Sequence, residues 1–324
     1  MTRWLWRAPG GKGVTATSEP LPWLRWRHRE VRDLAWVIGS PPLLTQPGWP
    51  DSGDCRHWLS CSQDWLATLD ADPAALLGFL AEARDHRLGH AVERLLCFWL
   101  SWPDNPCYRL VAHQVAIRED GRTLGELDFV VRSMATGQLE HWEIAVKFFL
   151  GIAPGGRLRD WVGPGLRDRL DLKVARLLTH QLPLARTPRA RAVLAGLPGA
   201  DGDGLSASRA LVKGCLFYPL DADLPSWQPH GTASDHLHGW WATQADFLRR
   251  FAETGLAWSL LPKAHWLTPL TAGEAPDDQR WMSPAELIAR LSDGSQRAVM
   301  AVIGCRDGRE VTRGFVAPAG WPAG

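Results

Sequence analysis

The stretch from residue 108 to residue 150 constrains the fold of this 324-residue chain more than any other, because it reads as three consecutive strands. Residues 108–117, 124–132 and 139–150 are rich in β-forming side chains, and the turn sequences EDGR and ATGQ separate them. Strands joined by connections this short pair as antiparallel neighbours. We therefore expect an antiparallel three-strand meander, whose apolar face other elements must cover.

Helical patterns flank the meander on both sides. Residues 88–102 place apolar side chains on one helical face until Pro103 ends the pattern. After the meander, residues 166–182 read as a basic amphipathic helix and residues 209–218 as a further strand. Residues 86–220 therefore predict a core with the order helix, three-strand meander, helix, strand, and an α/β (α+β) fold class.

The remaining segments read as additions to this core. Residues 1–22 predict a disordered lead-in, and residues 23–85 a helical N-terminal extension. Residues 221–324 predict a mixed α/β C-terminal layer that packs on the core. Within this layer, residues 239–253 read as a helix and residues 297–316 as a strand hairpin.

Composition excludes several classes of protein. The net charge is +1, which argues against a uniformly basic nucleic-acid coat. The longest apolar stretches, 95–100 and 298–303, are far shorter than the ~20 residues of a membrane span. None of the six cysteines forms a CxxC pair, so a zinc ribbon and a thioredoxin-like motif are not expected. Unpaired cysteines in a long chain fit a reducing compartment, and we expect a cytoplasmic protein with no membrane span.

An acidic pair lies on the predicted meander. Side chains alternate between the two faces of a strand, so Glu126 and Asp128 share one face, as do Glu143 and Lys147. With the turn centred near residue 135, the numbers of opposing residues add up to about 271, which places Asp128 across from Glu143. Two opposed carboxylates repel each other, so a cation between them or a proton on one of them is expected. Mg²⁺ and Mn²⁺ prefer such oxygen ligands.

The same residues also fit a plainer interpretation. Glu143 and Lys147 could form a salt bridge on a solvated sheet face, with Glu126 and Asp128 simply exposed. Two features favour a functional site instead. The chain has five lysines against 31 arginines, so a lysine on this face is unusual, and a basic helix follows the acidic sheet directly.

The sequences GELDFVV and WEIAVK, in this order of elements, resemble the PD-(D/E)XK nuclease superfamily. That superfamily has a restriction-endonuclease-like core, with an Asp on its second core strand and a Glu-x-Lys on its third. The resemblance implies that Asp128, Glu143 and Lys147 are catalytic, and that Asp128 and Glu143 bind Mg²⁺ or Mn²⁺. The spacing departs from the superfamily pattern, because it is Glu-x-x-x-Lys and Ala145 stands where the lysine is expected.

Further residues are candidates for the same site. Glu93, on the helix before the meander, is either a third metal ligand or an ordinary surface residue, and Glu126 is a fourth candidate ligand. Four basic residues around the next helix could contact phosphates: Arg167, Arg169, Lys173 and Arg176. They could also form a solvated helix face paired with Asp168 and Asp171. Gln181, at the end of this helix, either orients a water or caps the helix.

The chain as a whole further resembles a bacterial family, domain of unknown function 1853. The resemblance runs from about residue 28 to the end and includes the stretches RDLAWVIGSPPLL, WVGPGLRDRLDLK and RGFVAPAGW. It implies a nuclease-like fold more firmly than a reaction. The expected function is Mg²⁺-dependent hydrolysis of DNA or RNA. The alternative is a catalytically inactive fold that binds nucleic acid or protein, and the sequence leaves the oligomeric state open.

Overall fold

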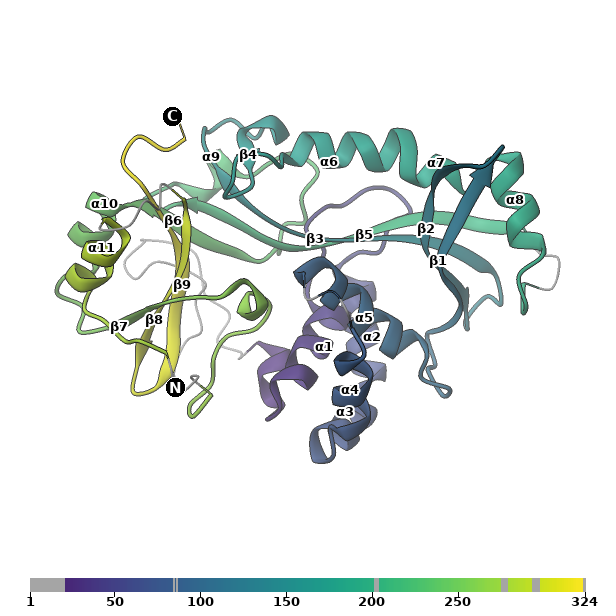
Figure 1. Ribbon diagram of the computed structural model, residues 1–324, viewed down its shortest axis with the longest axis horizontal. Coiled ribbons are helices and arrows are strands. Elements are labelled where there is room, and N and C mark those ends of the chain that lie inside the picture. Colours follow the sequence, from purple (N-terminus) through teal and green to yellow (C-terminus); the bar gives the residue numbers. More distant parts are fainter. Residues whose placement is uncertain are drawn as a thin grey trace.

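A nine-stranded mixed sheet organises the chain (Figure 1). The computed structural model describes residues 21–83, 85, 87–200, 204–274, 279–292 and 298–322, so residues 1–20 of the predicted lead-in lie outside the described residues. The strand order is β1-β2-β3-β5-β6-β9-β8-β7, and β4 pairs with β3 off this path. In chain order the strands are β1 (Tyr108–Glu119), β2 (Arg122–Ser133), β3 (Leu139–Gly151), β4 (Trp161–Val162), β5 (Leu205–Pro219), β6 (His238–Thr243), β7 (Ala257–Leu260), β8 (Met300–Arg306) and β9 (Arg309–Ala317).

The predicted meander is confirmed. β1, β2 and β3 pair antiparallel in chain order. Beyond β3 the pairing changes, because β3, β5, β6 and β9 lie parallel to one another. Antiparallel β9–β8 and β8–β7 pairs complete the sheet. The parallel strands therefore occupy the middle of the sheet, where each is hydrogen-bonded on both edges.

Two groups of helices lie on opposite faces of the meander and β5 (Figure 1). The N-terminal group consists of η1 (Pro22–Arg25), α1 (Arg29–Gly39), α2 (Ser52–Cys61), α3 (Gln63–Ala71), α4 (Ala74–Ala81) and α5 (Leu88–Leu100). The other group consists of α6 (Leu170–Arg176), the π-helical turn η3 (Leu177–Gln181), α7 (Leu182–Leu184) and α8 (Pro188–Ala195). The short elements η2 (Leu158–Asp160), α9 (Leu224–Trp227) and η4 (Lys263–His265) lie in connections.

Side chains of β3 pack alternately against these two helical layers. Trp142, Ile144 and Phe148 belong to the apolar core that includes the N-terminal helices. Ala145 and Phe149 pack instead with apolar residues of α6 and the π-helical turn. Because side chains alternate along a strand, the odd-numbered positions of β3 lie on the face that α6 covers.

The C-terminal layer differs from the prediction at one element. Residues 239–253, predicted as a helix, instead form most of β6 followed by α10 (Gln244–Phe251). Trp240 and Trp241 pair in parallel with β5 on one side and β9 on the other. A short apolar run carries no period that separates a buried strand from a buried helix, which explains the error. The predicted hairpin is confirmed as β8–β9, and α11 (Pro284–Ser292) precedes it.

One apolar core joins distant parts of the chain. Its buried residues run from Trp23 to Ala317 and include Trp36, Trp99 and Phe315. The sheet likewise continues across residue 220, where the sequence predicts the end of the nuclease-like core. The predicted core and the predicted C-terminal layer thus share one sheet.

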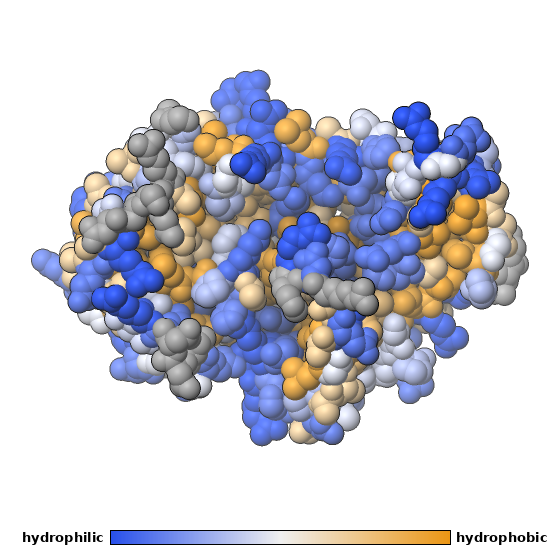
Figure 2. Space-filling view, viewed as in Figure 1, coloured by the Kyte–Doolittle hydropathy of each residue, from blue (hydrophilic) through white to orange (hydrophobic). Residues whose placement is uncertain are grey.

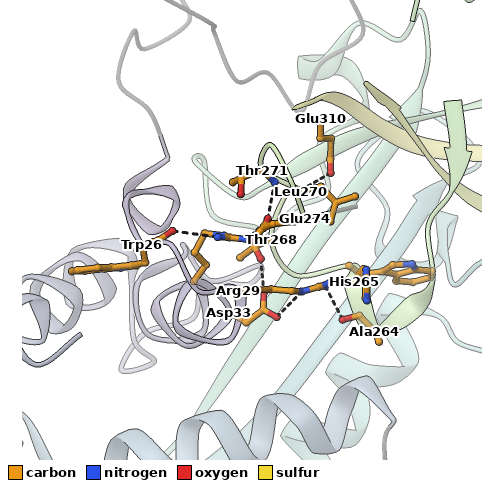
Figure 3. Close-up of polar contacts among 12 residues, drawn as sticks. Trp26, Arg29, Asp33, Ala264, His265, Thr268, Leu270, Thr271, Glu274 and Glu310 are labelled. Atoms are coloured by element: carbon orange, nitrogen blue, oxygen red, sulfur yellow. Dashed lines mark hydrogen bonds and ion pairs between the residues drawn. The ribbon is translucent and has the colours of Figure 1, made fainter. Parts of the chain in front are cut away.

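Polar contacts fasten α1 to the connection that follows β7 (Figure 3). Asp33 accepts a hydrogen bond from the Thr268 hydroxyl at 2.5 Å and pairs with Arg29 at 3.5 Å. Arg29 also donates to the carbonyl of Ala264 at 3.2 Å. Burial raises the pKa of Asp33 to about 6, although Arg29 and Thr268 act in the opposite direction. The N-terminal helices are therefore tied to the C-terminal layer by buried polar groups as well as by apolar packing.

An ion pair reinforces the same junction. Arg32 is only 1% exposed and donates to both carboxylate oxygens of Glu274 at 2.5 Å. Arg32 also donates to the carbonyl of Arg27 at 2.6 Å, at the start of α1. The pair joins residues 242 positions apart in the sequence.

Candidate functional site

β2 and β3 separate at the predicted acidic pair. Their ladder runs from Arg132–Leu139 to Phe129–Trp142, and the residue numbers of each pair add up to 271, as predicted. Beyond this point Asp128 supplies a side-chain partner, since its carboxylate accepts the N–H of Ile144 at 2.9 Å. The Asp128 carboxylate therefore occupies the place of a main-chain hydrogen-bond partner at the fork between the strands.

β1, which pairs with the edge of β2 that faces away from β3, is also distorted near Asp128. β1 pairs with β2 before and after Gln114, but Gln114 lies opposite Asp128 without a ladder pair. Its φ is 53°, in the left-handed region that side chains other than glycine rarely adopt. The Gln114 side chain lies near the carboxylate of Glu93 on α5 and acts to lower its pKa. Backbone strain of this kind collects at functional sites, where surrounding contacts hold it in place.

The carboxyl groups of Asp128 and Glu143 lie close enough for each to shift the pKa of the other. Burial raises the pKa of Glu143 to about 7, against the opposing effect of the Lys173 charge. Burial and then the charge of Glu143 raise the pKa of Asp128 to about 6. Two neighbouring carboxyls with raised pKa values together retain a proton near pH 6. A divalent cation bound by both groups would displace that proton.

A chain of hydrogen bonds holds Glu143 from the side of β5. Glu143 is fully buried, and one carboxyl oxygen lies 2.9 Å from Nε2 of His141. Nδ1 of His141 lies 2.7 Å from the Ser208 hydroxyl, which donates to the carbonyl of Leu182 at 3.0 Å. Burial lowers the pKa of His141 to about 4, so its ring is neutral. The Ser208 hydroxyl donates its hydrogen to Leu182, so Nδ1–H of His141 donates to the Ser208 oxygen. Nε2 of His141 therefore accepts a hydrogen bond from the protonated carboxyl of Glu143.

A lysine and a glutamine cover the pair from the α6 layer. Gln181 ends the π-helical turn and donates its amide N–H to the second carboxyl oxygen of Glu143. Its amide oxygen accepts a hydrogen bond from Nζ of Lys173 at 3.0 Å. Burial lowers the pKa of Lys173, and Glu143 and Asp128 act in the opposite direction because they lie near it. π-helical turns are rare and recur at functional sites, where they redirect a side chain.

Glu93 brings a third carboxylate to the same region. Burial and then the charge of Asp128 raise the pKa of Glu93, so the two carboxylates lie close enough to interact. His90, one turn earlier on α5, lies 3.6 Å from the Glu93 carboxylate. Asp128 and Glu143 come from neighbouring strands, and their oxygen atoms are of the kind that Mg²⁺ and Mn²⁺ prefer. The Glu93 carboxylate interacts with Asp128 electrostatically, but the three carboxylates do not all lie within 4.8 Å of one another.

The Lys147 side chain is directed toward Asp168 and not toward the acidic pair. Its ammonium group pairs with the Asp168 carboxylate at 2.5 Å, in the connection between β4 and α6. The lysine nearest to the acidic pair is therefore Lys173 of α6, which the sequence had suggested as a phosphate contact. The salt bridge that the plainer interpretation gave to Glu143 and Lys147 is formed by Lys147 and Asp168 instead.

The other predicted residues divide into two groups. Arg176 lies close enough to Glu143 to lower the pKa of that carboxyl, as Lys173 does. Arg169 is held by a two-point pair with Asp171 at 2.7 and 2.8 Å, as the solvated-face alternative predicts. Glu126 is exposed opposite Ala116, and no hydrogen bond or ion pair joins it to the acidic pair within the described part of the chain.

An open cleft adjoins Glu93 on the side of the N-terminal helices. Its volume is about 670 Å³, and its polar lining includes Arg87, His90, Glu93, Lys147 and Lys263. A smaller cavity of about 290 Å³ shares Lys147 with it and extends to Arg167 and Asp168. In the space-filling view, the middle of the molecule is mainly hydrophilic where α5 approaches the C-terminal layer (Figure 2). A groove of mixed charge therefore runs beside Glu93, with Asp85 paired to Arg87 and Asp168 paired to Lys147 in its lining.

Comparison with known families places most of the chain in one family. The model of the family named domain of unknown function (DUF1853) matches residues 32–317. The chain belongs to this DUF1853 family. No curated protein and no solved structure matched the chain. Among the described residues, none of the helices has the length and apolar character needed to cross a membrane.

Several residues around the acidic pair escaped the sequence analysis. His141 and Ser208 belong to strands and carried no motif, since their contact depends on the parallel pairing of β3 with β5. Gln114 carried no signal either, because its strained backbone follows from the distortion of β1. Gln181 was considered as a water-orienting residue or a cap, and it instead joins Glu143 to Lys173.

Proposed function

We propose that this DUF1853 protein hydrolyses phosphodiester bonds in nucleic acid with Mg²⁺ or Mn²⁺, on a restriction-endonuclease-like core of the PD-(D/E)XK type. The proximity of the Asp128 and Glu143 carboxyls at the fork between β2 and β3, where each shifts the pKa of the other, is the observation that carries the proposal. The element order α5, β1, β2, β3, α6 and β5 supports such a core. Asp128 and Glu143 occupy the positions that the resemblance assigns to the metal ligands.

The residues around the fork have different roles in the proposed reaction. Asp128 and Glu143 would hold the cation, and Glu93 would add a more distant carboxylate. A bound Mg²⁺ or Mn²⁺ would activate a water and neutralise charge on the phosphate. Lys173 places a positive charge beside the two carboxyls, where the missing lysine of the Glu-x-Lys pattern would act. Gln181 fixes the position of Lys173 and of Glu143 at once.

The groove suggests the path of the polynucleotide. Arg87, Lys147 and Lys263 line the cleft beside Glu93, and Arg167 continues this basic lining in the smaller cavity. Contacts of this kind bind phosphates without reading sequence and weaken as salt rises. Lys147 therefore belongs to substrate binding in this proposal, and Lys173 to the reaction centre.

A catalytically inactive module that binds nucleic acid or protein is the second candidate. The full burial of Glu143 beneath Gln181 favours it, because both carboxyl oxygens already have partners. The pair of Lys147 with Asp168 favours it as well. In this case the acidic pair keeps its proton and serves the fold alone.

Cleavage assays with the full chain distinguish the two candidates. Single- and double-stranded DNA and RNA are incubated with Mg²⁺ or Mn²⁺, and we expect chelator-sensitive cleavage of at least one substrate. Asp128→Asn and Lys173→Ala should abolish cleavage. Lys147→Ala should mainly weaken substrate binding, because its ammonium group lies outside the reaction centre. Glu126→Gln, on the same strand as Asp128, is the matched control and should cleave at the wild-type rate.

The inactive alternative has its own signature. It predicts no cleavage of any substrate and no effect of Mn²⁺ on the melting temperature of the wild type. Salt-dependent binding of nucleic acid that survives Asp128→Asn would support a binding module. Cleavage that survives Asp128→Asn would contradict the proposed metal centre.

A further inference from the structure

A second group of potential metal ligands lies away from the carboxylates, between α2 and the start of β1. His57 and Cys61 are four residues apart and so share one face of α2. Cys107 immediately precedes β1. One ligand atom from each of these three residues lies within 4.8 Å of the other two. We propose that His57, Cys61 and Cys107 bind a zinc-like divalent transition metal.

The distances fit a tetrahedral centre. Sγ of Cys61 lies 3.7 and 3.8 Å from the two ring nitrogens of His57. Zn–S bonds of ~2.3 Å and Zn–N bonds of ~2.0 Å place neighbouring tetrahedral ligands roughly 3.5–3.8 Å apart. Small side-chain rotations therefore suffice to bring all three ligand atoms to one cation.

Rigid supports hold the ligands in place. The Asn105 side chain accepts the N–H of Cys107 at 2.9 Å, and the carbonyl of Cys107 accepts the N–H of Met134 at 2.9 Å. α2 begins at a reciprocal cap in which Asp51 and Asp54 each accept a backbone N–H of the other. The ligands thus come from fixed elements, which is the arrangement that favours a preorganised metal site.

Charge and ligand type select the metal. A divalent metal deprotonates coordinating thiols and makes the site electrically neutral with a neutral imidazole. Thiolate and imidazole ligands favour zinc, whereas the oxygen-only site at Asp128 and Glu143 favours magnesium. The two sites therefore differ in the metal that they select.

His57 is exposed to solvent, so water can reach the proposed metal. Three protein ligands leave the fourth tetrahedral position to water. The metal would link α2 to the start of β1. β1 is an edge strand in the order of the described strands. The site thus acts as a clamp between the N-terminal helices and the meander, independent of the proposed nuclease reaction.

Metal titration of the reduced, chelator-treated full chain tests the proposal. Co²⁺ is the probe, because its thiolate complexes absorb in the near ultraviolet, and Zn²⁺ should then displace it. We expect one equivalent of thiolate-bound Co²⁺ per chain. His57→Ala changes an exposed helix residue and should weaken Co²⁺ binding at least ~10-fold. Asp128→Asn should bind Co²⁺ at this site like the wild type, which separates this result from the proposed function.

A cysteine variant completes the test. Cys61→Ser should lose most of the thiolate absorption, whereas Cys97→Ser changes a half-buried cysteine of α5 outside the cluster and should retain it. The proposal is overturned if reduced wild-type protein gives no thiolate absorption with Co²⁺. It is overturned equally if His57→Ala and Cys97→Ser bind Co²⁺ with the same affinity as the wild type.

Discussion

Replacement of Glu143 by Gln tests the electrostatics of the acidic pair directly. Gln has nearly the shape of a protonated Glu, and its amide can donate to Nε2 of His141 while its oxygen accepts from Gln181. The substitution therefore imitates the protonated network without opening a cavity. It removes the titration of a carboxyl whose pKa rises from 4.5 to about 7 on folding.

The sign of the pH dependence follows from proton counting. Both folded-state pKa values lie above their ordinary values of 4.5 and 3.8. The folded protein therefore binds more protons than the unfolded chain between about pH 4 and pH 7. The free energy of unfolding of the wild type falls as pH rises through this interval, through the contribution of these two groups, and levels off above pH 7.

The structure also gives the magnitude. A tenfold change in acid dissociation corresponds to ~1.4 kcal/mol, so the rise for Glu143 amounts to about 3 kcal/mol. The two carboxyls interact, so their contributions do not simply add. We expect Glu143→Gln to match the wild type at pH 5 and to exceed its free energy of unfolding by about 2–3 kcal/mol at pH 8.

Urea unfolding at both pH values, followed by tryptophan fluorescence, measures the difference. Glu126→Gln is the control, because it removes an exposed carboxylate from β2 without changing the buried network, and its effect should stay within about 0.5 kcal/mol. A Glu143→Gln protein that is less stable than the wild type at pH 8 would refute the reasoning. So would a difference that is the same at pH 5 and pH 8.

Three further outcomes follow from the structure. Gly214→Ala should cost more than about 4 kcal/mol or prevent folding, because φ at Gly214 is +142° and an added Cβ would lie 1.7 Å from the carbonyl oxygen of Lys147. Glu274→Gln should lower the free energy of unfolding by about 3–5 kcal/mol in urea titrations, since it leaves the charge of buried Arg32 uncompensated. Mn²⁺ should raise the melting temperature at pH 8 but not at pH 5, because protons compete with the cation for the carboxyl pair.

Each of these outcomes has a matched comparison. Gly78→Ala, in an open position of α4, should be neutral or stabilising by up to about 1 kcal/mol. Asp221→Asn breaks the exposed pair with Arg249 and should cost less than about 1 kcal/mol. Equal losses of stability in Gly214→Ala and Gly78→Ala would contradict the close contact at Gly214. Equal losses in Glu274→Gln and Asp221→Asn would contradict the importance of burial for the Arg32–Glu274 pair. A Mn²⁺ effect of the same size at both pH values would contradict proton competition.

The sequence predicts the meander and its register because both are local. Short turns force antiparallel pairing, and the turn centre fixes which residues lie opposite one another. The placement of Asp128 opposite Glu143 could therefore be predicted from residue numbers alone. The same reasoning holds for α5 and α6, whose apolar faces repeat with a clear helical period.

The identity of the lysine at the pair could not be predicted in this way. Strand alternation places Lys147 on the correct face, but Asp168 in a later connection draws its ammonium group away. Lys173 reaches the pair because of the π-helical turn and the contact with Gln181, which depend on how α6 packs. β6 was predicted as part of a helix for a related reason. Its tryptophans belong to a strand because they pair with β5 and β9, which are distant in the sequence.

The helix α2 carried a local signal that the sequence analysis passed over. Asp51 and Asp54 have the spacing of a reciprocal cap, and the structure contains that cap. His57 and Cys61 also have the spacing of neighbours on one helix face. Cys107 could not be added to them from sequence, because only the packing of α2 against the start of β1 brings it close.

The position of β9 bears on how the chain is made by the ribosome. β9 follows the other described strands in the sequence, yet it lies between β6 and β8 and hydrogen-bonds to both. At ~5–20 residues per second, about 3–13 seconds pass between the synthesis of β6 and that of β9. During that time the edge of β6 has no partner and can pair with another chain. A premature stop before residue 309 would leave this edge open permanently, so nascent or truncated chains should depend on chaperones more than the finished protein does.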